Sequence, residues 1–385
     1  MADKFYFSRD TEVYLIKDSS KWLIPVLDGF SFSQGTNTSE ITLNEMADGS
    51  GNSRRSRQLF TDSYAPAEWS FQTYLRPLIA TAGATNGWEG SGSDAHHHAV
   101  EEALWAAFMG AATFTKTSGA TEAAWSDTVT NSTSNVIFDF TGSEVPALGT
   151  FDLFFEMGAT QGSAETFYKL ANCVVSSVSI DFDIDGIATA TWSGNASMIT
   201  DESTLGSGTL ISEGTTSTGN FIRNRLTQLA VTAADTTTFA GAGSGVYNLV
   251  LTGGNITMEN NITYLTPETL GVVNQPLGHV TGTRSVTGNF TCYLNNETGG
   301  SADLFEDLIE ANTVVTNSFN TVFSIGGTTA STPRVKIDLP KCHFEVPSHS
   351  IDDIISLDVA FHALPASVDP SSADNFEAKV TYFGA

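Results

Sequence analysis

The chain has few basic residues, and this shortage excludes one large class of functions. Only 17 of its 385 residues are Lys or Arg, against 43 Asp or Glu, which gives a formal net charge of −26. Proteins that grip nucleic acids neutralise phosphates with basic side chains. A chain this acidic is therefore not expected to bind DNA or RNA tightly, and its surface would also repel anionic membranes.

Cysteine and long apolar runs are scarce as well. The chain has three cysteines: Cys173, Cys292 and Cys342. Three is a small and odd number, which does not suit a disulfide framework, so we expect buried thiols in a reducing compartment. No run reaches the roughly 18–20 apolar residues that span a bilayer. The first ten residues, MADKFYFSRD, lack the basic and apolar blocks of a secretory signal. We therefore expect no membrane binding by this chain.

Catalytic and metal-binding motifs are missing too. There is no G-x-S-x-G elbow, P-loop, dinucleotide fingerprint or H-E-x-x-H pair. The acids of residues 181–185 match the opening of a calcium loop, but the twelfth position is Trp192 instead of Glu. His96, His97 and His98 point in different directions as neighbours, which favours a solvated loop end over a metal site. We expect neither an enzyme nor a cofactor.

What the chain does contain is a set of landmarks that occur twice in the same order. The pattern Phe-x-x-Tyr-Leu stands at 71–75 and again at 290–294, and Leu-x-x-Cys stands at 170–173 and again at 339–342. The offset falls from 219 (Phe71 to Phe290) to 169 (Cys173 to Cys342). A repeat with a shrinking offset indicates two copies of one fold, the first carrying extra loops.

The boundary between the copies lies near residues 200–220, where the sequence becomes rich in Gly, Ser and Thr. We assign residues 1–212 to the first domain and 213–385 to the second. The extra material of the first domain maps near 81–98 and 112–146. Both stretches have the composition of surface loops.

Alternation of apolar and polar residues predicts a mainly β fold. It is clear at 174–184, where Asp185-Gly186 then offers a type I′ turn to a return strand at 187–192. Residues 99–109 and 302–311 instead show an apolar stripe with helical spacing. The fold class is therefore mainly β (β+α), with two tandem β-sandwich or partial-barrel domains, each with one amphipathic helix packed on the sheet.

The densest positive charge in the chain is the cluster Arg54, Arg55 and Arg57, within a long connection at 44–62. One interpretation is a solvated loop. The other is an arm that docks on an acidic neighbour of the same protein, since self-association of an acidic chain needs local charge complementarity. The sequence leaves both open.

Taken together, these features resemble the tail tube (major tail) proteins of long-tailed bacteriophages. The resemblance rests on the strand ending in Phe-x-x-Tyr-Leu, the long loop before it, the helix after it, the segment 339–342 (LPKC) and the opening 221–229 (FIRNRLTQL). It covers nearly the whole chain when counted as two copies.

The resemblance implies a structural virion protein that forms stacked rings with six domains per ring, so that a tandem chain forms a trimeric, pseudo-hexameric ring. The loops at 44–62 and 267–282 would reach the adjacent ring, with Arg54, Arg55 and Arg57 as inter-ring contacts. The second loop keeps only Arg284 nearby. Partners would be further copies, the tape measure and the tail terminator, in a virion assembled in the host cytoplasm.

A negative bore would let viral DNA pass without binding it. The acids Asp181, Asp183 and Asp185 are our candidates for lining that bore. The duplication favours a non-contractile tail, that is, a siphovirus. Two alternatives remain: a carbohydrate- or receptor-binding β-sandwich of a tail tip or fibre, and a capsid decoration protein.

Overall fold

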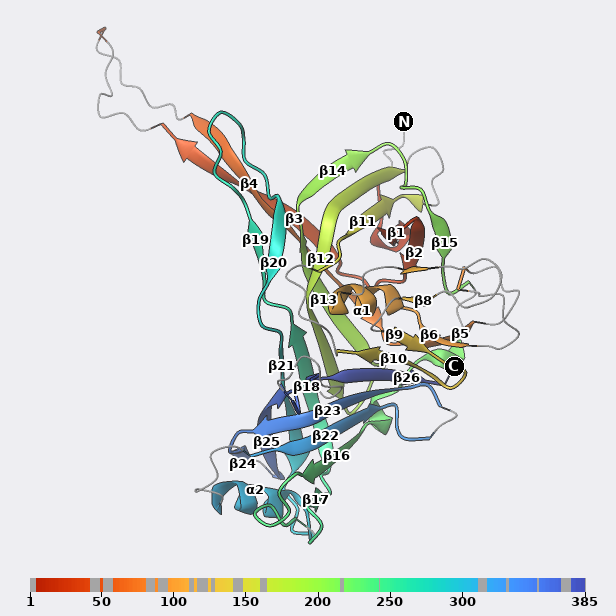
Figure 1. The fold of residues 1–385 in the computed structure, drawn as a ribbon, viewed down its shortest axis with the longest axis vertical. Coiled ribbons are helices and arrows are strands. Elements are labelled where there is room, and N and C mark those ends of the chain that lie inside the picture. The colour runs from red at the N-terminus through yellow and green to blue at the C-terminus, as the bar shows by residue number, and fades with distance from the viewer. Residues whose placement is uncertain are drawn as a thin grey trace.

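A computed structural model of the chain is built almost entirely from β-strands (Figure 1). The structure describes residues 5–41, 49–50, 58–80, 87–88, 96–110, 114–115, 124–125, 129–140, 148–159, 165–214, 218–241, 243–310, 317–329, 332–351, 353–367 and 375–384. Within these ranges there are two α-helices, α1 (Glu102–Met109) and α2 (Ser301–Glu310). The predicted mainly β fold class is confirmed.

The strands of the first half are β1 (Thr11–Lys17), β2 (Ser20–Ile24), β3 (Ser31–Glu40), β4 (Leu59–Tyr74), β5 (Pro77–Ala80), β6 (His96–Ala99), β7 (Phe114–Thr115), β8 (Ala124–Trp125), β9 (Val129–Asn131), β10 (Asn135–Asp139), β11 (Phe151–Met157), β12 (Thr166–Asp183), β13 (Thr189–Ala196), β14 (Met198–Glu202) and β15 (Thr209–Ile211). The strands of the second half are β16 (Gln228–Ala233), β17 (Val246–Tyr247), β18 (Leu251–Glu259), β19 (Ile262–Leu265), β20 (Gly278–Thr281), β21 (Ser285–Tyr293), β22 (Phe319–Ile325), β23 (Arg334–Phe344), β24 (Ser348–Ile351), β25 (Ile355–Leu364) and β26 (Lys379–Phe383). Short 3₁₀ turns are η1 (Ser8–Asp10), η3 (Thr218–Asn220) and η4 (Asn224–Leu226).

The two halves pair their strands in the same order. In the first half the order is β2–β1–β11–β12–β13–β4–β3, and in the second it is β17–β16–β22–β23–β25–β21–β18, all antiparallel. A further strand lies on the start of β12 and of β23, namely β14 and β26. Each of these eight strands of one half therefore has an equivalent position in the other.

A β-bulge marks the same place in both halves. In the first half the register of β11 with β12 shifts just after Phe151 faces Cys173, and in the second that of β22 with β23 shifts just after Phe319 faces Cys342. Both cysteines are fully buried. Burial raises the pKa of both thiols, that of Cys342 to about 12, so they serve as small apolar side chains.

One hydrophobic core runs through both halves of the chain, and the two helices contribute to it unequally. α1 is buried along its whole length, whereas α2 buries only Ser301, Leu304 and Leu308. The helix predicted at 99–109 is present, but the prediction that it is amphipathic is wrong, because α1 has no solvent face. It also begins later than its composition indicated, because Ala99 belongs to β6. Gly110 ends α1 in the left-handed conformation, with φ at 78°.

Two local expectations are wrong. The connection after β12 spans residues 184–188, and of these only Gly186 has a positive φ (102°), so it is not a two-residue type I′ turn. The insertion at 112–146 is not merely surface loop, because Val136, Phe138 and Phe140 are buried. Its strand β10 pairs with β26 of the second half, so residues 135–139 of the insertion belong to the core.

Candidate functional site

One continuous sheet runs across both halves. The second part of β12 pairs with β13 along one edge and with β18 along the other, from Ser177 opposite Glu259 to Asp183 opposite Gly253. This pairing joins four strands of each half in the order β3–β4–β13–β12–β18–β21–β25–β24. Figure 1 shows β13, β12, β18 and β21 through the middle of the molecule, with β3 and β4 running to the upper left and β24 and β25 at the lower left. We call this assembly the eight-strand sheet.

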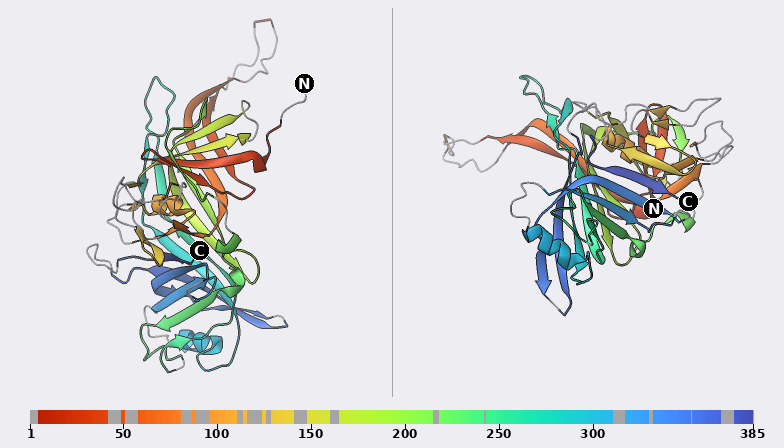
Figure 2. Two further views of the ribbon diagram at one scale, coloured as in Figure 1. Left: turned by 90° about the vertical axis from the view of Figure 1, so that its right-hand side faces the viewer. Right: turned by 60° about the horizontal axis from the view of Figure 1, so that its bottom comes forward.

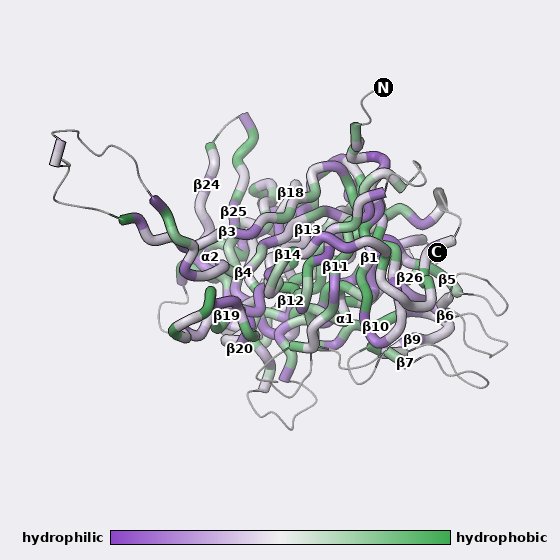
Figure 3. The backbone as a smooth tube through the Cα atoms, turned by 90° about the horizontal axis from the view of Figure 1, so that it is seen from above, coloured by the Kyte–Doolittle hydropathy of each residue, from purple (hydrophilic) through white to green (hydrophobic). Residues whose placement is uncertain are grey.

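The eight-strand sheet has one apolar and one polar face, because side chains alternate along each strand. Its apolar face carries Trp69, Phe71, Trp192, Phe290 and Phe361, all at most 2% exposed. Figure 3 shows the matching alternation of hydrophobic and hydrophilic residues along the backbone.

The polar face is composed of rows of mostly polar residues, in which each residue faces its partner on the next strand. One row is Gln72, Thr191, Ser179, Thr257, Thr287 and His362. The next is Tyr74, Thr189, Asp181, Asn255, Asn289 and Ala360. A third is Ser31, Ser70, Ser193, Ser177, Glu259 and Ser285.

Side chains on this face bind one another across the strands. The Asn255 amide donates to Ser179 Oγ and to Asp181 Oδ1, both at 2.9 Å, which links the two halves. The hydroxyls of Ser177 and Ser193 lie 2.7 Å apart. These cross-strand contacts hold the polar groups in place without burying them.

The polar face has acids and no strong base. None of the residues of the eight strands, counting β12 from Val174, is Lys or Arg. The acids on this face are Glu68, Asp181, Asp183, Glu259 and Asp358. The surface is therefore negative and rich in hydroxyl and amide groups.

Of the three acids predicted to line the bore, the structure places two on the polar face and one in a turn. Asp181 and Asp183 are exposed on the polar face, which also carries Glu259 and Asp358, two acids that sequence reasoning missed. Asp185 lies in the turn beyond β12, and its Oδ1 is 3.1 Å from Arg225 Nη1. The Ser/Thr/Asn alternation in β18 and β21 was the signal that would have revealed the rest of the face.

Two hairpins project together from one side of the molecule (Figures 1 and 2). They are β3–β4 of the first half and β19–β20 of the second. They touch where the Tyr64 amide donates to the Asn274 carbonyl at 2.9 Å and the Asn274 amide donates to the Asp62 carbonyl at 3.1 Å. Arg54, Arg55 and Arg57, which belong to the β3–β4 connection, lie outside the described residues.

The tip of the second hairpin is apolar and exposed. Leu270 is fully exposed, and Val272 and Leu277 are 64% and 77% exposed. Single exposed apolar residues are ordinary, but a group of them on one projecting hairpin indicates a contact surface.

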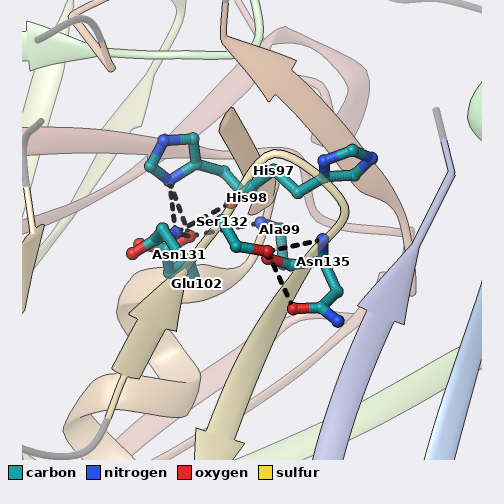
Figure 4. A network of polar contacts seen from close by, with 7 residues as sticks. All are labelled: His97, His98, Ala99, Glu102, Asn131, Ser132 and Asn135. Atoms are coloured by element: carbon teal, nitrogen blue, oxygen red, sulfur yellow. Dashed lines mark hydrogen bonds and ion pairs between the residues drawn. The ribbon is translucent and has the colours of Figure 1, made fainter. Parts of the chain in front are cut away.

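The histidine run does not form the solvated loop end that the sequence indicated. His96–Ala99 is strand β6, paired with β5, and His97 and His98 are buried. Figure 4 shows their rings pointing in opposite directions, as expected for neighbours in a strand. His98 Nδ1 lies 2.9 Å from Glu102 Oε2 and 3.0 Å from the Asn131 amide nitrogen. The run is therefore part of the packing around α1.

A buried polar cluster connects the halves behind the eight-strand sheet. Tyr382 on β26 donates to Glu101 Oε1 at 2.5 Å, and Trp105 Nε1 donates to the Tyr382 hydroxyl at 2.8 Å. The Arg76 backbone amide also donates to Glu101, while the Arg76 guanidinium pairs with Glu213 at 2.7 Å. Burial raises the pKa of Glu101 to about 7, although these hydrogen bonds and the charge of Arg76 act to lower it.

This carboxyl predicts a pH dependence of stability. Because the folded pKa of Glu101 is about 7 and its ordinary value is 4.5, the folded state holds the proton more tightly. Its contribution is therefore largest below about pH 4.5 and falls by about 3 kcal/mol as pH rises through 7. Glu101→Gln keeps an acceptor for Tyr382 but cannot ionise. We expect the free energy of unfolding of the wild type, minus that of the variant, to drop by this amount between pH 4 and pH 8 in urea titrations. A difference that stays constant with pH would refute the assignment.

No metal site or membrane helix accompanies these features in the part of the chain that the structure describes. The described residues hold no group of three or more His, Cys, Asp or Glu side chains placed to bind a metal ion. None of the described helices is long and apolar enough to cross a bilayer.

Comparisons with known proteins agree on one family. A family profile described as "Phage tail tube protein" matches residues 32–363. The chain is also similar to "Tail tube protein pb6" of Escherichia phage T5, with 29% identity over 354 residues that cover 90% of this chain and 68% of the relative.

Proposed function

The chain belongs to the phage tail tube protein family, and from this we propose that three copies close into one pseudo-hexameric ring of the tube. It is a structural protein of the phage tail that assembles with itself and with other tail proteins. What the family leaves open is how many chains form a ring, which face lines the bore and which groups touch the next ring.

One observation carries the proposal of three chains: the joint between β12 and β18. It connects two halves whose strands pair in the same order, so it resembles a joint between neighbouring units. In the second half, β24 pairs with β25 where, in the first half, the end of β12 pairs with β13. In the first half, β3 pairs with β4 where, in the second half, β18 pairs with β21. These two strands end the eight-strand sheet. Repeating the joint would place β24 of one chain beside β3 of the next.

The register of this repeated joint follows from equivalent rows. Asp181 and Ser350 occupy equivalent positions. Asp181 faces Thr189, which faces Tyr74 at the end of β4. In the same way, Ser350 faces Ser356, which faces Tyr293 at the end of β21. Asn255 and Ser31 are equivalent because their β21 and β4 partners, Asn289 and Ser70, stand one residue before Phe290 and Phe71. Since Asp181 faces Asn255 within the chain, Ser350 would face Ser31 between chains.

Three chains of eight strands would give a closed ring of 24 strands. Closed sheets of 16–18 strands already leave an aqueous channel, so a ring of this size suits a wide conduit. Closure also gives each terminal strand a partner and removes an open edge that would otherwise aggregate. Rotation by thirds closes the ring, while stacking extends it into a tube.

The polar face of the eight-strand sheet would line the bore. The apolar face is occupied by the core, so the other face is the one left for the lumen. Asp181, Asp183, Glu259 and Asp358 would repel DNA phosphates, and the absence of Lys and Arg removes the groups that would hold them. DNA would pass such a wall without specific binding.

The two projecting hairpins would make the contacts between rings. Their apolar tip, with Leu270 and Leu277, suits a surface that becomes buried on stacking. Arg54, Arg55 and Arg57 would add positive charge that an acidic neighbouring ring attracts. The tape measure and tail terminator would be further partners. The chain would act without catalysis or cofactor, assemble in the host cytoplasm and serve a non-contractile tail.

Negative-stain electron microscopy of the concentrated protein tests this function directly. We expect hollow tubes with a regular axial repeat, and end-on rings with threefold averages. Persistent monomers, or compact trimers that never stack, would favour the tail-tip or capsid decoration alternatives instead.

A further inference from the structure

The halves of the chain meet at a second joint, outside the eight-strand sheet. Five residues of β10 pair with five of β26, from Asn135 opposite Phe383 to Asp139 opposite Lys379. An ion pair of 3.0 Å between Lys379 Nζ and Asp139 Oδ2 reinforces the last of these pairs. The Trp105–Tyr382–Glu101 cluster lies behind these strands, with the Phe138 ring edge-on to Tyr382 at 5.7 Å.

Two more side chains of the second half bond to the first half close to this joint, Asn260 just after β18 and Arg284 just before β21. Buried Asn260 donates to the carbonyls of Phe108, at the end of α1, and Val175, on β12, at 2.8 and 3.1 Å. Arg284 donates to the Phe140 carbonyl at 3.1 Å and lies over the Phe140 ring. We call β10, β26 and these cross-joint side chains the clamp.

At the proposed joint between chains, the described residues of the second half offer no counterpart of β10. The strand equivalent to β26 is β14, which pairs with β12 in the described residues. β10 comes from the long segment between α1 and β11, residues 110–150. The matching segment of the second half, between α2 and β22, is only residues 311–318. Eight residues are too few for a β9–β10 hairpin with its connections.

We propose that the clamp locks the two halves into one rigid unit before assembly, and that a ring therefore contains two kinds of joint. Three joints, one within each chain, are clamped; three joints, between chains, rest on the β24–β3 contact without a clamp. This inference rests on the proposed ring for its second part, whereas the clamp itself is a property of the single chain. When a tube built this way comes apart, it separates at the joints between chains, and the two halves of each chain stay together.

Amide hydrogen exchange tests the two parts separately, on monomers and on assembled tubes of the full chain. In the monomer, amides of β10 and β26 are expected to be protected as strongly as those of β12. In tubes they change little, while those of β3 and β24 gain protection. Unprotected β10 and β26 amides in the monomer would overturn the clamp, even if tubes form. Protected β10 and β26 without any tube would leave the clamp standing and count against the ring.

Tyr382→Phe provides the sharper variant, with Tyr247→Phe as its matched control. Each removes one buried hydroxyl that donates to a carboxylate, Glu101 across the joint and Asp307 within the second half. We expect Tyr382→Phe to speed exchange in both β10 and β26 by about tenfold or more, and Tyr247→Phe to leave β10 unchanged. Arg284→Gln, a partly exposed position, should act like Tyr382→Phe if the latter fails to fold. Equal effects of Tyr382→Phe and Tyr247→Phe on β10, or none from either joint variant, would refute the clamp.

Discussion

Oxidation of tubes formed by the double variant Ser31→Cys/Ser350→Cys is expected to produce covalent trimers and no longer species. The proposed joint between chains would place Ser350 of one chain opposite Ser31 of the next. Directly opposed residues of antiparallel strands have Cα atoms about 4.5–5.5 Å apart, which lies within the range that a disulfide bridges. Denaturing, non-reducing electrophoresis would then show a ladder that ends at three chains.

The chain is well suited to this experiment because its own cysteines are buried. Both substituted serines are exposed in the single chain, so neither change removes a core contact. The control pair is Ser39→Cys/Ser350→Cys, since Ser39 lies eight residues farther along β3, roughly 26 Å away at strand spacing. A ladder that continues past three chains would refute the trimeric ring, and equal cross-linking of both pairs would refute the register.

Reversing the charge of the polar face is expected to impair genome delivery while leaving tubes intact. Asp181→Lys with Asp358→Lys would place six lysines in each proposed ring, one from every half. Opposite unit charges about 4 Å apart attract by roughly 1 kcal/mol in water, and the contact repeats in every ring. We expect the infectious titre of phage carrying this variant to fall by more than about tenfold, with DNA retained in particles that have attached to cells.

The matched control is Glu306→Lys with Glu310→Lys on the solvent side of α2. It makes the same change in net charge, and both positions are exposed. It should form tubes and deliver DNA at close to the wild-type level. If both variants lose titre equally, net charge and not the lining of a bore explains the effect; if neither does, the polar face does not meet DNA.

Local patterns predicted much of the fold, because they depend only on residues that are close together in the sequence. The Phe-x-x-Tyr-Leu repeats end β4 and β21, and alternation at 174–184 identified the polar side of β12 with Asp181 and Asp183. The matching spacing of Leu170–Cys173 and Leu339–Cys342 marked equivalent strands. The bulge at Phe151 and Phe319 was not visible, because a register shift depends on the partner strand.

What failed to be predicted depends on contacts between distant residues. The joint of β12 with β18 pairs residues 70 to 82 positions apart, and that of β10 with β26 pairs residues 240 to 248 positions apart. Polarity misled at His98, because this side chain is buried with a hydrogen-bond partner, Glu102, that its polar neighbours did not indicate. Asp358 joined the polar face only through the order of the strands.

The bracing of one hairpin by the other at Asn274 has a mechanical consequence. In a stacked tube, a bending load that enters through either hairpin would pass by way of the Tyr64 and Asp62 backbone into both halves of the chain. Strain would be spread over two anchor points instead of one hinge. A tail made of such units could flex in solution and recover its straight axis without its rings slipping out of alignment.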